Sequence, residues 1–370
     1  MTGGSVGAAA GLPSSPSPTR VPWSGRGSIY TEDEIATVVV GALKARLLTD
    51  EQKASHHLTD NADAHVQFLL GRSLRDRDTP DANREAVGAF SRAVRLDPDF
   101  AAAYGELSEA YWRLADQVTG DSADYDRAVA AADKAIAMAP SLADGYISRA
   151  ILRIFYFFDW QGAQVDLDHA LALEPSNAGA LSIRAYLYGA LGRMPEAIGA
   201  ARRSVELAPL SVGFQRTLAL LLIDDGQLAQ ADAVGRQLLT IAPDNPSARV
   251  TQARILFAKG DYAASLALMR RYDATFGYFM TSIIDHRLGD AAGSQAALDR
   301  LIAQGATTFA YQIAEAYALR GQADKAFEWL DRAVAQHDGG VVYLKRDAML
   351  APLRADPRFA ALLRRLKLPQ

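Results

Sequence analysis

Helical runs rich in alanine and leucine recur along this chain, and they end at regularly spaced prolines. Three successive runs close at Leu173-Glu174-Pro175, Leu207-Ala208-Pro209 and Ile241-Ala242-Pro243, so each of these prolines follows the last by 34 residues. The same kind of ending occurs at Asp97-Pro98 and Ala139-Pro140. Proline cannot continue a helix and biases the residue before it away from helical angles. Each of these prolines is therefore predicted to mark the end of a repeated unit.

Small residues have the same spacing inside the best-defined units: Ala185, Gly192 and Ala197 in one, and Ala219, Gly226 and Ala231 in the next. Glycine readily adopts the left-handed conformation that follows the end of a helix. Each unit is thus predicted to be a helix, a turn that contains glycine, and a second helix, with small residues where the two helices cross. About eight units are expected, and they start near residues 61, 101, 143, 177, 211, 245, 275 and 307.

A helix–turn–helix unit with this period and these small residues resembles the tetratricopeptide repeat (TPR). The resemblance implies an all-α fold, a right-handed superhelical solenoid of about eight repeats with capping helices at its ends. Such repeats bury their apolar faces only against their neighbours, so the stack would share one continuous core. This overrides the two or three separate domains that 370 residues would otherwise suggest.

A narrower resemblance is carried by the unit from Trp160 to Pro175, with Ala163 and Leu167, and by the tail that contains Asp338-Gly339-Gly340 and Asp356-Pro357. Both are similar to the C-terminal TPR region of bacterial regulators. In that group the repeats follow a winged-helix or an adenylate/guanylate cyclase domain, often with a TolB-N-terminal-like module between. The effector domain and most of the middle module have no counterpart in this sequence, so the effector's activity is not carried over.

Four segments are expected. Residues 1–28 form a low-complexity disordered tail, and residues 29–60 form a capping helix and linker, in which Thr31 and Glu34 make a capping box. Residues 61–336 form the solenoid, and residues 337–370 form a C-terminal capping segment. In that last segment, Asp356 is expected to cap a helix that begins with Pro357.

The composition of the chain argues against several classes of function. The net charge is −4, without a concentrated basic region, which argues against nucleic-acid binding. No apolar run approaches the ~18 residues of a membrane span, and the amino terminus makes a poor signal peptide, so a cytoplasmic protein without membrane insertion is expected. The absence of cysteine excludes disulfides, thiolate metal sites and a cysteine nucleophile. A monomer or a weak homo-oligomer is expected.

Candidate catalytic patterns are weak. Gly3-x-Ser5-x-Gly7 matches a nucleophile elbow, but it lies in the expected disordered tail, without the strand and helix that this motif needs. His56, His57 and His65 lack the spacing of known metal sites. We therefore predict a protein that is not an enzyme and that has no cofactor and no metal site.

Five aromatic side chains crowd into Phe155-Tyr156-Phe157-Phe158-Asp159-Trp160. The register places their start at the end of a first helix and Asp159 as the N-cap of the second. Neighbouring residues on a helix are about 100° apart, so these side chains cannot share one face. Packing in the core and turn, or partner binding by Phe155 or a neighbour, are the alternatives.

In repeats of this family the first helix of each unit lines the concave face. Matching positions unit by unit gives the expected partner-binding residues: Glu109, Trp112, Ile147, Ile151, Ser182, Tyr186, Arg216, Leu220, Asp224, Arg254 and Phe257. This mixture suits an extended peptide or a helix. The family's carboxylate-clamp variant uses Lys and Asn at positions that hold Gly105, Glu109, Ile147 and Ser182 here, so binding of a chaperone tail is not expected.

The predicted function is thus a protein–protein interaction scaffold that binds a protein or peptide on its concave face. The alternative is a regulatory or sensory fragment that controls a separately encoded cyclase or transcription regulator.

Overall fold

The computed structural model describes residues 59–369, except residues 78, 270–271 and 273. The expected tail at residues 1–28 and almost all of the expected capping helix and linker at residues 29–60 lie outside the described residues. So do His56 and His57.

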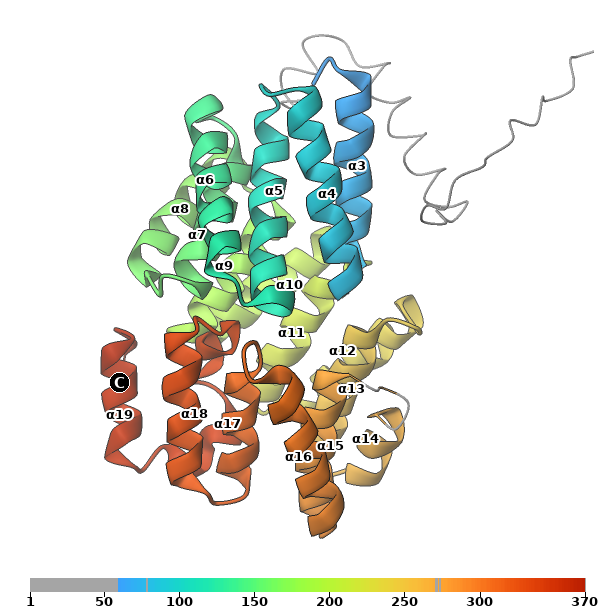
Figure 1. Cartoon of the computed structure of the whole chain (residues 1–370), viewed down its shortest axis with the longest axis vertical. Helices are drawn as coiled ribbons and strands as arrows, with labels where there is room; N and C mark the ends of the chain where they lie inside the picture. The colour runs from blue at the N-terminus through green and yellow to red at the C-terminus, as the bar shows by residue number, and fades with distance from the viewer. Residues whose placement is uncertain (1–58, 78, 270–271, 273, 370) are drawn as a thin grey trace, which may run out of the picture.

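Eight consecutive antiparallel helix pairs make up most of the described chain, and no strand occurs there (Figure 1). They confirm the predicted helical solenoid and its eight units. The pairs are α3 (Ala62–Asp76) with α4 (Pro80–Leu96), α5 (Ala101–Leu114) with α6 (Ser122–Met138), α7 (Ala143–Phe155) with α8 (Trp160–Leu173), α9 (Ala178–Ala190) with α10 (Met194–Leu207), α11 (Val212–Asp224) with α12 (Leu228–Ile241), α13 (Pro246–Ala258) with α14 (Tyr262–Met269), α15 (Thr275–Leu288) with α16 (Ala291–Gly305), and α17 (Ala310–Leu319) with α18 (Ala323–Ala335).

Local chemistry sets the helix ends as the sequence predicts. Gly192 and Gly226 have φ of 78° and 75°, in the turns between the two helices of their units. Asn177 caps α9 by accepting a hydrogen bond from the Ala180 amide at 2.9 Å. Ala197 and Ala231 are fully buried, because the two helices of a unit cross too closely for a larger side chain.

The C-terminal segment returns to the early repeats. It consists of η2 (Gly339–Tyr343), η3 (Ala348–Leu353) and α19 (Pro357–Arg365), and Asp356 caps α19 as predicted. Its apolar side chains pack with the last repeat in one core. The amide of Gly339 also donates to Asp116 Oδ1 at 3.1 Å, beyond the end of α5. The C-terminal segment therefore lies against earlier repeats, and η2 contacts both α7 and α9.

The aromatic stretch divides between several environments. Phe155 is buried between the rings of Trp112 and Tyr186, at centroid distances of 4.9 and 5.4 Å. Phe157 is 52% exposed. Asp159 caps α8 by accepting from the Gly162 amide at 3.0 Å, and the Trp160 indole N–H donates to the Leu366 carbonyl at 2.7 Å. Core and turn packing therefore accounts for most of the stretch, whereas Phe155 also faces the inner side of the solenoid.

Over the described part of the chain, none of the helices has the length and apolarity that crossing a membrane requires.

Candidate functional site: the inner groove

A groove of about 1110 Å³ lies on the inner side of the solenoid, and we call it the inner groove. Helices α3, α5, α7, α9 and α11 supply half of its lining residues, and each is the first helix of its repeat. The C-terminal segment contributes residues 338–340 and Tyr343. Five successive repeats therefore present one continuous surface, which the last segment of the chain partly closes.

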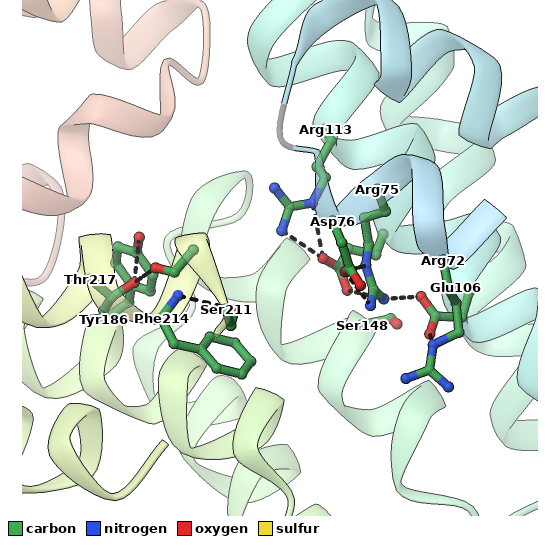
Figure 2. Close-up of polar contacts among 12 residues, drawn as sticks. Arg72, Arg75, Asp76, Glu106, Arg113, Ser148, Tyr186, Ser211, Phe214 and Thr217 are labelled. Carbon is green, nitrogen blue, oxygen red and sulfur yellow. Dashed lines mark hydrogen bonds and ion pairs between the residues drawn. The ribbon is translucent and has the colours of Figure 1, made fainter. Parts of the chain in front are cut away.

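The floor of the inner groove is apolar and aromatic. Ile147 and Ile151 come from successive turns of α7, and Trp112, Phe155 and Tyr186 surround them. The hydroxyls of Tyr186 and Thr217 form a hydrogen bond at 3.0 Å, which fixes the Tyr186 ring against α11 (Figure 2). The floor thus consists of closely packed apolar side chains, each at most 9% exposed.

One wall carries a network of arginines and glutamates from α3 and α5 (Figure 2). Glu106 pairs with Arg75 and, at 3.5 Å, with Arg72. Glu109 pairs with Arg113 at 2.8 Å and with Arg75 at 3.8 Å. Because the carboxylates and Arg75 are mostly shielded from solvent, these pairs hold α3 and α5 in a defined relative position.

Several carboxyl groups of the groove have raised pKa values. Burial raises the pKa of Asp144 to about 7, and the nearby Glu106 and Glu174 raise it further. Burial also raises the pKa of Asp116 to about 6, although the amide of Gly339 and the guanidinium of Arg113 oppose this shift. In total, seven carboxylates and four arginines line the groove. Its lining therefore carries an excess of acidic groups.

The C-terminal segment forms another part of the lining. Asp338 accepts hydrogen bonds from the amides of Tyr311 and Gly340, at 2.9 and 2.8 Å. A Cβ at Gly340 would lie 2.6 Å from the Tyr311 Cβ, so only glycine allows this close approach. The Tyr343 ring lies 6.2 Å from that of Tyr186, where it borders the floor.

Seven of the eleven expected binding residues line the inner groove: Glu109, Trp112, Ile147, Ile151, Ser182, Tyr186 and Arg216. Leu220, Asp224, Arg254 and Phe257 are not part of its lining, and their role in partner binding stays a prediction. Asp224 pairs with Arg346 of the C-terminal segment, and Arg254 lies 3.6 Å from Glu315 of α17. Phe257 is buried, with its ring 5.3 Å from that of Tyr262.

Four residues that were not expected to bind a partner also line the groove: Asp116, Asp144, Phe214 and Tyr343. Asp144 precedes Ile147 by three residues and therefore shares its helix face, so the spacing could have identified it. Tyr343 carries no such signal, because it belongs to no repeat.

Replacing Asp144 with asparagine is expected to raise the free energy of unfolding at pH 8 by about 3 kcal/mol. The folded state holds a proton on Asp144 that the unfolded state releases between about pH 4 and pH 7, so the native carboxyl lowers stability as pH rises through this window. The dipole of α7 favours a carboxylate in its first turn and offsets part of the cost.

The increase in the free energy of unfolding caused by Asp144→Asn should become smaller below pH 7 and should vanish near pH 4. Urea unfolding followed by circular dichroism at several pH values measures it, with Asp126→Asn on an exposed part of α6 as the control. An equal effect of Asp144→Asn at all pH values would contradict the raised pKa.

These features define the class: an all-helical repeat protein with a groove on its inner side. The family model "Tetratricopeptide repeat" matches residues 159–212, 216–277 and 287–341. Residues 159–341 therefore contain tetratricopeptide repeats, as their period predicts. Repeats of this family generally serve as scaffolds for protein–protein interaction.

The chain is similar to several solved structures at low sequence identity. A human IFIT1 dimer with PPP-AAAA is 12% identical with a TM-score of 0.52, over 82% of this chain and 78% of that one. Yeast Tom70 is 15% identical with a TM-score of 0.49, over 90% of this chain and 70% of that one. A thermophilic TPR protein of Thermus thermophilus is 21% identical with a TM-score of 0.43, over 52% of this chain and 99% of that one. At these identities the likeness concerns the fold alone. No curated protein matches the chain in sequence.

Proposed function

We propose that this protein is a non-enzymatic scaffold that binds an extended segment of a partner protein in the inner groove. The observation that carries the proposal is the continuity of the lining over five repeats, α3 to α11, with an apolar floor and charged walls. The volume of about 1110 Å³ exceeds the range of about 300–1,000 Å³ that is typical of small-molecule pockets. An apolar floor with polar walls suits a peptide whose side chains anchor in the centre.

A cytoplasmic location and a monomeric or weakly self-associating state belong to the same proposal. The regulatory alternative, control of a separately encoded cyclase or transcription regulator, rests on the sequence resemblance alone. The regulatory alternative also requires a protein partner, so the two functions differ in where the partner binds. The scaffold would bind it in the inner groove, and the regulatory fragment would bind it at the ends or on the outer face.

Two glycines offer a matched test. Gly213 lines the groove on α11 and Gly199 lies on the exposed side of α10, and a Cβ added to either would meet no heavy atom within 4 Å. Tryptophan is therefore expected to fit at both positions without disturbing the fold, but only Gly213→Trp fills the groove.

Affinity capture from native cells with quantitative mass spectrometry compares the two variants with the wild type. Gly213→Trp is expected to reduce a specific partner by at least about tenfold, while Gly199→Trp retains it. Equal melting temperatures confirm that both variants fold. A partner retained by both variants would contradict the groove proposal and would move the site to the ends or the outer face, in favour of the regulatory alternative.

A further inference from the structure

We propose that the segment bound in the inner groove presents a lysine or arginine side chain to Asp144, next to an apolar side chain that packs on the floor. The inference rests on the proposed function and names the chemistry of the partner.

Charge complementarity gives the first argument. The arginines of the α3–α5 wall are already paired, Arg75 with Glu106 and Arg113 with Glu109. Asp144 lies in the same lining, half-buried at the start of α7. Its carboxylate has no ion-pair partner and no hydrogen-bond donor among the described residues. A cation from the partner protein would form the ion pair that this carboxylate lacks.

The indole of Trp112 gives an independent argument. Trp112 lines the groove with only 7% of its surface exposed, and its N–H has no acceptor among the described residues. A buried donor without an acceptor costs free energy. A backbone carbonyl of an extended peptide is an acceptor of the right kind. The two unsatisfied groups, a carboxylate and an N–H donor, match a basic side chain and the peptide backbone.

The electrostatic surroundings of Asp144 support the same partner. Burial raises the pKa of Asp144, as do Glu106 on α5 and Glu174 after α8, whereas Arg72 and Arg75 on α3 lower it, and the net result is a pKa of about 7. The ionised carboxyl is therefore unfavourable in the unbound protein. Groups that lower stability in this way are often retained for a function. Binding of a cation would favour the ionised form, so binding should release a proton near neutral pH.

Two libraries of dodecapeptides with blocked termini test the inference. Their flanks are random but contain no Asp, Glu, His, Lys or Arg, and their central residue is fixed as Lys in one library and as Glu in the other. The full chain is immobilised, and the retained peptides are quantified by mass spectrometry. The best sequence of each library is then synthesised, and its Kd is measured by fluorescence anisotropy.

At pH 8 the best Lys peptide is expected to bind about tenfold more tightly than the same peptide with Glu. Asp144→Asn should remove most of this preference, and Asp126→Asn on α6 should preserve it. The preference should also weaken as pH falls towards 5.5, because protonation neutralises Asp144. Gly213→Trp should abolish the binding of both peptides.

Two results would overturn the inference. If Lys and Glu peptides bind equally and Gly213→Trp blocks both, the groove still binds peptides and only the preference for a cation is wrong. If neither library yields binding that Gly213→Trp removes, both the preference and the proposed peptide binding fail.

Discussion

Replacing Arg346 with methionine is expected to lower the free energy of unfolding by about 3–5 kcal/mol. The Arg346 side chain is 3% exposed and pairs with Asp224, 9% exposed, at the end of α11. Its guanidinium also lies 4.5 Å from the centre of the Tyr343 ring. Removal of the guanidinium leaves a buried carboxylate without its partner, and this accounts for most of the loss.

Chemical denaturation measures this effect, and two further variants isolate its cause. The double variant Arg346→Met/Asp224→Leu should recover much of the loss, because it removes the uncompensated charge. Arg365→Met breaks an exposed pair with Asp331 and should cost at most about 1 kcal/mol. If Arg346→Met lowered the free energy of unfolding no more than Arg365→Met, the pair of Arg346 with Asp224 would not hold the C-terminal segment in place.

Replacing Trp160 with alanine is expected to cost about 3–5 kcal/mol. Trp160 is buried where α8 meets the C-terminal end of the chain, and its N–H donates to the Leu366 carbonyl. The variant loses a large buried ring and leaves that carbonyl without its donor. Trp160→Phe keeps an aromatic ring and should cost less, about 1–3 kcal/mol, mainly because the buried carbonyl loses its donor.

Thermal unfolding compares these two variants with Trp329→Ala, since Trp329 is only half-buried on α18. Trp160→Ala should have the lowest melting temperature of the three. If Trp329→Ala destabilised the protein as much, the contact between α8 and the end of the chain would contribute little to stability.

The helix pairs could be predicted from the sequence because their signals are local. The pairs α9–α10 and α11–α12 show these signals most fully: glycine in the turn, alanine at the crossing and proline after the second helix, all within one period. The inner position of Ile147, Ser182 and Tyr186 follows from the same register. These features were therefore predictable without any knowledge of long-range contacts.

The packing of the C-terminal segment against earlier repeats could not be predicted in this way. The hydrogen bond from Gly339 to Asp116 and that from Trp160 to Leu366 join residues more than 200 positions apart. No repeat pattern relates these residues, because the C-terminal segment belongs to no repeat. For this reason Asp224, expected on an open inner surface, pairs with a segment whose path the period does not describe.

Photo-crosslinking tests the central claim, partner binding in the inner groove, most directly. A benzoylphenylalanine replaces Phe214, which lines the groove, or Phe157, which is exposed outside it. Both proteins are irradiated in native cells, and the crosslinked peptides are sequenced. The account predicts that position 214 crosslinks one defined segment of a partner and that position 157 does not. Crosslinks to that partner from position 157 alone would place the binding surface elsewhere and contradict the account.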